Sequence, residues 1–110
     1  GKKTPIMDED MYGIRLILNS WKQALSALPI DELRFYEQEK ELHIVTGGTH
    51  CIFSLESGQG EVDTLKTLID KGNVVLSRLT YIDLRIPKRV YTCPKSEGAC
   101  SQNLAHIYNN

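Results

Sequence analysis

Two adjacent glycines constrain the fold of this chain more than any other feature. Gly47-Gly48 joins two runs of alternating character, 42–46 and 49–55. A two-residue Gly-Gly link is typical of a β-hairpin whose turn needs positive φ values. The turn also fixes the strand register, so we expect the cross-strand pairs Thr46–Thr49, Ile44–Cys51 and Leu42–Phe53. With Leu55 these residues form one largely apolar face, and the other face carries His43, Val45, His50, Ile52 and Ser54.

Helical periodicity lies on both sides of this hairpin. Between Asp8 and about Ala27, apolar residues recur at spacings of three and four, which predicts an amphipathic helix. Its apolar stripe comprises Met11, Ile14, Leu18, Trp21 and Leu25. Acidic residues in the first turn complement the positive end of the helix dipole, and Asp8 could also cap it. A second helix is expected over 61–71, ending at Gly72-Asn73.

Three further segments read as strands: 31–38, 81–86 and 89–93. The order α-β-β-β-α-β-β predicts an α+β fold, with a mostly antiparallel sheet and helices packed on one face. We expect residues 5–94 to form a single domain, because 110 residues suffice for one core. The polar segment 95–110 is expected to be a loosely ordered C-terminal tail.

Composition and motifs exclude several functional classes. Lys and Arg number 13 against 14 Asp and Glu, so the chain lacks the basic surface that nucleic acid requires. No apolar run approaches the roughly 18 residues of a membrane span. No apolar stretch follows Gly1-Lys2-Lys3, so no secretory signal is visible, as expected for a domain cut from a longer chain. Neither phosphate-loop glycines nor a paired acid and base occur. We therefore expect no enzyme activity, no cofactor, no metal and no small-molecule substrate.

The three cysteines leave alternatives open. Cys93 and Cys100 enclose a short polar loop, and the spacing permits either a disulfide, which would suggest an oxidising compartment, or free thiols. A metal site of Cys93, Cys100 and His106 lacks the usual ligand spacing. Cys51 is expected in the core. The competing hypothesis is a small cytosolic ligand-binding or enzyme domain that uses His50 and Cys51, although neighbouring strand residues point to opposite faces.

Two surfaces remain as candidates for contact with a partner. The strand 89–93 is the last of the sheet, and an unpaired last strand offers backbone donors and acceptors to which a partner strand can bind. The opposing interpretation is that Pro94 and the residues after it cover this edge. A third hypothesis is a purely structural domain whose first helix packs onto a neighbour through Tyr12, Leu16 and Ile17.

The segment Tyr81-Ile-Asp-Leu-Arg-Ile-Pro-Lys-Arg-Val-Tyr91 resembles the bacterial cell-division family FtsQ/DivIB. The C-terminal region of that family often carries a segment like Y-I-D-L-R-F-P-x-R-V-Y, and here Ile86 replaces the usual aromatic residue. The order of elements before it is similar over about Pro5 to Cys93. Cys93, Pro94 and the Cys100 loop are not typical of the family.

The resemblance implies a non-catalytic scaffold domain on the extracytoplasmic side of the cell membrane. Its parent protein would have a short cytoplasmic tail, a single membrane helix and a POTRA domain before this β domain. The implied partners are division proteins of the FtsB/DivIC and FtsL type, bound by strand addition at the last strand. Carried over to this sequence, the binding edge comprises Arg89, Val90, Tyr91 and Thr92, flanked by Tyr81, Asp83 and Arg85.

Overall fold

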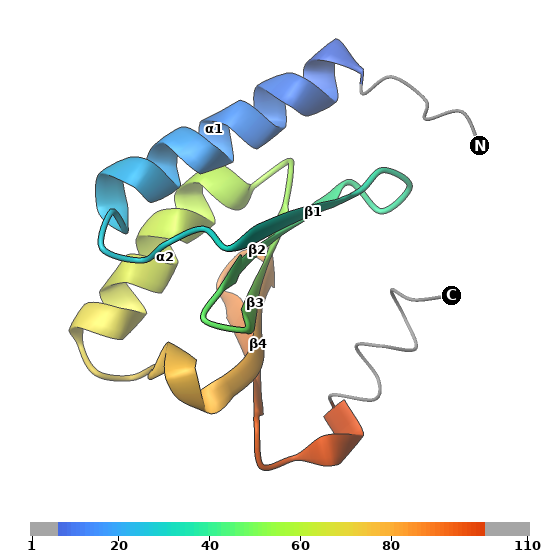
Figure 1. Cartoon of the computed structure of the whole chain (residues 1–110). Coiled ribbons are helices and arrows are strands. Elements are labelled where there is room, and N and C mark those ends of the chain that lie inside the picture. Colours follow the sequence, from blue (N-terminus) through green and yellow to red (C-terminus); the bar gives the residue numbers. More distant parts are fainter. Residues whose placement is uncertain (1–6, 101–110) are drawn as a thin grey trace.

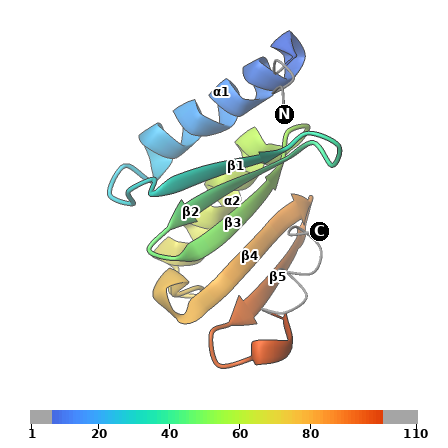
Figure 2. The same cartoon turned by 45° about the vertical axis from the view of Figure 1, so that its right-hand side comes forward.

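The computed structural model describes residues 7–100 and has an α+β fold, as the sequence predicts (Figure 1). One five-stranded sheet carries two α-helices on the same face (Figure 2). The elements in chain order are α1 (Asp8–Ala24), β1 (Glu32–Tyr36), β2 (Glu41–Thr46), β3 (Thr49–Ser54), α2 (Gly58–Asp70), the 3-10 turn η1 (Leu76–Arg78), β4 (Leu79–Ile86) and β5 (Arg89–Pro94).

The sheet is mostly antiparallel and its strands follow the chain in the order β1-β2-β3-β4-β5. The predicted hairpin register is confirmed, with Leu42 opposite Phe53 and Ile44 opposite Cys51. Gly47 and Gly48 have φ values of 56° and 80°, which glycine adopts without steric cost. The alternation did not reveal that β3 and β4 are parallel. That pair needs a crossover connection, and α2 supplies it.

The core lies between the sheet and the two helices. Trp21 of α1 and Phe53 of β3 are buried and meet edge to face, with ring centroids 6.3 Å apart. The Trp21 indole N–H donates to the carbonyl oxygen of Leu28 at 3.1 Å, which satisfies its one polar group. Ile17 is fully buried although the predicted stripe omitted it. The buried face of α1 is therefore centred between Ile14 and Trp21.

The helix ends differ from the sequence prediction. α1 ends at Ala24, and Met7 rather than Asp8 is its N-cap residue. α2 begins at Gly58, three residues earlier than expected. A Cβ atom at Gly58 would lie 2.5 Å from Ile17 Cδ1 and 3.2 Å from Phe53 Cβ. The missing side chain thus lets the first turn of α2 pack directly on the core.

A disulfide joins Cys93, at the end of β5, to Cys100, with Cα atoms 5.9 Å apart. The loop that it closes is also held by its backbone, since Lys95 N donates to Arg78 O at 2.9 Å and Glu97 N donates to Pro94 O at 3.0 Å. The rest of the predicted tail, 101–110, including His106, lies outside the described residues, as do residues 5 and 6 of the predicted domain.

Candidate functional site

Within residues 7–100, β5 lies at one edge of the sheet and pairs only with β4 (Figure 2). The two strands form an antiparallel hairpin whose turn has Lys88 at a φ of 67°. Cross-strand pairs include Ile82 with Thr92 and Asp83 with Tyr91. The segment that carries the family resemblance is thus one structural unit: β4, its turn and β5.

A backbone hydrogen bond of Lys95, the residue after β5, shows which β5 amides point toward β4 and which point away from the sheet. Lys95 N donates to the carbonyl oxygen of Arg78, the last residue of η1 directly before β4, so the Lys95 amide points to the β4 side of β5. Successive amides of a strand alternate in direction. The N–H groups of Arg89, Tyr91 and Cys93 therefore face β4, and those of Val90 and Thr92 face outward. The next outward position is Pro94, which has no N–H.

The side chains of β5 divide between the core and the surface. Val90 is half-buried and packs against the core, and Cys93 is fully buried. Arg89, Tyr91 and Thr92 are exposed, with Tyr91 at 49%. These two side chains hold the strand from opposite faces, Val90 on the helix side and Cys93 beside Tyr81 on the other side. The exposed side chains of β5 offer an aromatic ring, a guanidinium and a hydroxyl group.

The three predicted flanking residues lie on the face of the sheet opposite the helices. Asp83 is only 9% exposed and accepts from Arg85 Nε at 2.9 Å and Nη2 at 2.6 Å. Arg85 Nη1 also donates to Glu41 on β2 at 2.7 Å. Tyr81 is half-buried beside His50 and Cys93. Asp83 and Arg85 therefore fix the sheet through charge-assisted hydrogen bonds, and the accessible part of the predicted edge reduces to β5 itself.

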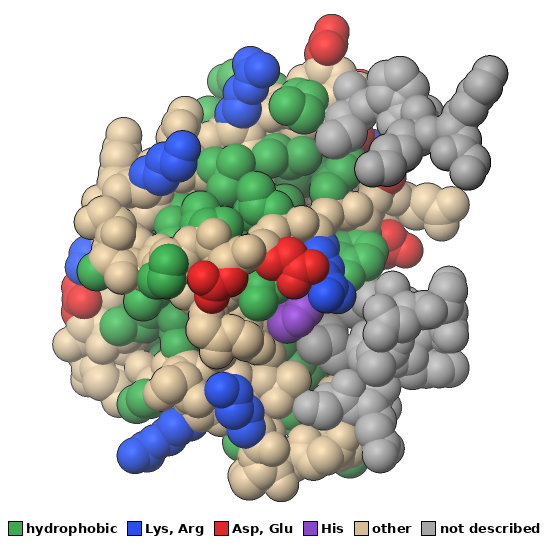
Figure 3. Space-filling view, viewed as in Figure 1, with side chains coloured by type: hydrophobic (Ala, Val, Ile, Leu, Met, Phe, Trp, Pro, Cys, Tyr) green, Lys and Arg blue, Asp and Glu red, His purple; other side chains and the backbone are tan. Residues whose placement is uncertain are grey.

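Two histidines lie beside this ion-pair network. The Nδ1 atoms of His43 and His50 are 3.2 Å apart, and the Tyr36 ring centroid is 4.7 Å from that of His43. Burial, and next the proximity of His43, lowers the pKa of His50. Glu32 and Arg34 on β1 form an exposed ion pair of 2.7 Å, and both charges act on His50. Figure 3 shows acidic, basic and histidine side chains gathered on one face of the molecule. Sequence reasoning missed Glu41 and Tyr36 because no local pattern marks them.

The arrangement gives no support to a His50/Cys51 nucleophile pair. Cys51 is fully buried among apolar side chains, on the face opposite His50. Burial raises the pKa of its thiol to about 12, so the reactive thiolate is scarce at neutral pH.

Comparison of the chain with family models, curated proteins and solved structures finds no match. Among residues 7–100, no group of three or more His, Cys, Asp or Glu side chains is placed to hold a metal ion. No helix in that same part of the chain is long and apolar enough to cross a membrane.

Proposed function

We propose that this domain is a non-catalytic scaffold that binds a partner protein by strand addition at β5. The observation that carries the proposal is the outward direction of the Val90 and Thr92 amides at a sheet edge. A partner strand gains affinity from such main-chain groups and selectivity from the side chains beside them. Arg89 and Tyr91 supply those side chains.

The contacts that hold β5 in place also favour this role. Val90 packs against the core, and the Cys93–Cys100 bridge holds the far end of the strand. An edge that is already ordered loses little conformational entropy when a partner binds. The same edge has only two outward amide donors before Pro94, so the partner strand should be short.

The proposed setting is bacterial cell division, on the extracytoplasmic side of the cell membrane. The support is the resemblance of Tyr81–Tyr91 to the FtsQ/DivIB segment, which here folds as the β4–β5 hairpin. A disulfide suits an oxidising compartment of this kind. The partners are then coiled-coil division proteins of the FtsB/DivIC and FtsL type, and the parent protein is anchored by one membrane helix.

A pair of substitutions at one position tests strand addition. Thr92→Pro removes an outward N–H, whereas Thr92→Val removes the hydroxyl group and keeps the N–H. We expect Thr92→Pro to weaken binding to the purified FtsB/FtsL-type complex of the same organism about tenfold, the order of one or two lost hydrogen bonds. Thr92→Val should bind as the wild type does, and isothermal titration calorimetry measures both.

The melting temperature of each variant shows whether the fold is intact. Proline is tolerated at an edge position whose N–H faces away from the sheet, so both variants should unfold cooperatively near the wild-type temperature. Equal affinity of a folded Thr92→Pro variant and the wild type would refute strand addition at β5. Absence of any binding by the wild type would refute the proposed partners.

A further inference from the structure

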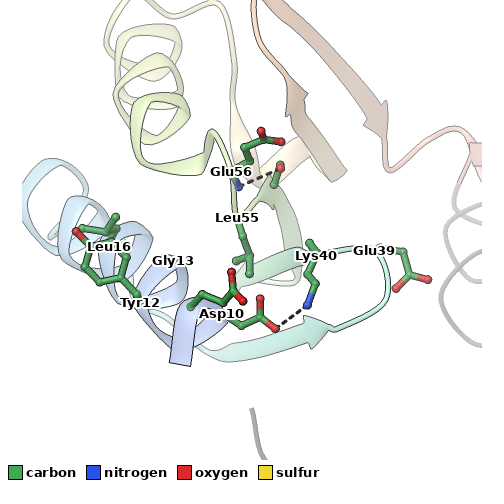
Figure 4. Close-up of a pocket in the computed structure, with 10 residues that line it drawn as sticks. Asp10, Tyr12, Gly13, Leu16, Glu39, Lys40, Leu55 and Glu56 are labelled. Carbon is green, nitrogen blue, oxygen red and sulfur yellow. Dashed lines mark hydrogen bonds and ion pairs between the residues drawn. The ribbon is translucent and has the colours of Figure 1, made fainter. Parts of the chain in front are cut away.

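A hollow of about 670 Å³ opens between the first half of α1, the turn that joins β1 to β2, and the end of β3. Figure 4 shows that its walls come from three parts of the chain that are distant in sequence. Tyr12, Leu16 and Leu55 contribute apolar surface, and Glu9, Glu39 and Glu56 contribute carboxylates. None of the lining residues belongs to β4 or β5, so the hollow is separate from the proposed binding edge.

The walls of the hollow are fixed to one another. Lys40 Nζ donates to Asp10 Oδ2 at 2.8 Å and so ties the turn to α1, while Leu55 N donates to Lys40 O at 2.9 Å and ties the turn to β3. Gly13 brings α1 close to the strand end, because a Cβ atom there would lie 3.4 Å from Leu55 Cβ. A concave surface that is formed in advance costs little to order on binding.

The charges around the hollow are mostly negative. Asp10 is 5% exposed and pairs with Lys40, so these two charges offset one another. The exposed carboxylates of Glu9, Glu39 and Glu56 remain, one from each of the three walls. These three carboxylates form the acidic rim of the hollow, whose remaining lining combines the apolar side chains with the Asp10–Lys40 ion pair.

Tyr12 indicates the kind of occupant. It lies at the hollow with 65% of its surface exposed, the largest exposed fraction among the exposed large hydrophobic side chains of the described residues. Exposed tyrosines are enriched where proteins bind other proteins. Of the three α1 residues considered for contact with a neighbour, Ile17 is fully buried in the core, and Tyr12 and Leu16 line the hollow.

We infer that this hollow docks a basic, amphipathic segment of a partner protein. An apolar side chain of that segment packs against Tyr12 and Leu55, and its lysine or arginine side chains pair with Glu39 and Glu56. The acidic rim repels nucleic acid and anionic lipid. A metal cation would make no use of the apolar side chains of Tyr12, Leu16 and Leu55. The site goes beyond strand addition at β5 and would give the domain a second, independent contact.

A synthetic helical peptide with a lysine face and a leucine face is the probe, and its glutamate counterpart is the control peptide. Titration of the ¹⁵N-labelled chain should move the amide signals of Tyr12, Glu39 and Leu55 with the basic peptide alone. Glu39→Gln combined with Glu56→Gln should weaken binding about fivefold, the order expected for two exposed ion pairs. Tyr12→Ala should cause a similar loss.

The matched control combines Asp63→Asn with Glu97→Gln, which removes two exposed carboxylates outside the hollow. It should bind the basic peptide as the wild type does. Thr92→Pro should also bind this peptide normally, and that result would distinguish the hollow from the proposed binding edge at β5. An equal loss in the matched control, or unchanged binding by Tyr12→Ala, would overturn the inference by showing a nonspecific charge effect. Calcium chloride that moves the same signals and displaces the peptide would overturn it in favour of a cation site.

Discussion

The Cys93–Cys100 bridge should contribute strongly to the stability of this domain. It joins two residues seven apart in sequence. In the chain-entropy model, closing a loop of about eight residues stabilises the folded state by about 2.5 kcal/mol at 25 °C. Cys100→Ser removes the bridge and leaves Cys93 in its buried position, so the free energy of unfolding should fall by about that amount.

Urea denaturation followed by circular dichroism measures the effect. For a domain of this size the dependence on urea is about 1.3 kcal/mol per molar, so the midpoint should fall by about 2 M. The reduced wild type provides the matched control, because it lacks the same bond without any substitution. Reduced wild type and Cys100→Ser should unfold at the same midpoint. An oxidised wild type that unfolds at that midpoint too would refute the reasoning.

Three other perturbations have defined outcomes. Gly58→Ala should destabilise the domain by about 1–3 kcal/mol, because the new Cβ atom would press on Ile17 and Phe53. Gly60→Ala is the control, since no atom lies within 4 Å of a Cβ atom at that position. Thermal melts compare the two variants, and equal melting temperatures would contradict the packing at Gly58. Native Cys51 should resist alkylation at pH 7 because burial raises the pKa of its thiol to about 12; mass spectrometry that finds rapid labelling would contradict this. Burial lowers the pKa of His50, so the unfolded chain binds more protons than the folded one, and the free energy of unfolding should fall as the pH drops below about 6.5. His50→Gln should reduce the dependence of the free energy of unfolding on pH, as measured by urea titrations. An unchanged dependence would exclude His50 as its source.

Local patterns predicted most of the fold. The Gly47-Gly48 turn and the alternation beside it fixed which residues of β2 and β3 face each other, because side chains in a strand repeat with a period of two. The parallel pairing of β3 with β4 could not be read from the sequence. It depends on where α2 returns the chain to the sheet, and alternation along β4 is the same for either direction.

The candidate surfaces were predictable only in part. The last strand is at an edge of the described sheet. The sequence did not indicate that Arg85 bonds to Glu41 as well as to Asp83, because Glu41 lies 44 residues from Arg85. The hollow beside Tyr12 was equally hidden. It is assembled from three segments, and each of them alone looks like ordinary solvated surface.

Pro94 limits what the open edge can recruit. A second copy of the domain that paired with this edge would find no N–H donor at that residue. Proline at the end of β5 therefore shortens the ladder that another copy of the domain could form along this edge of the described sheet, and so disfavours edge-to-edge association.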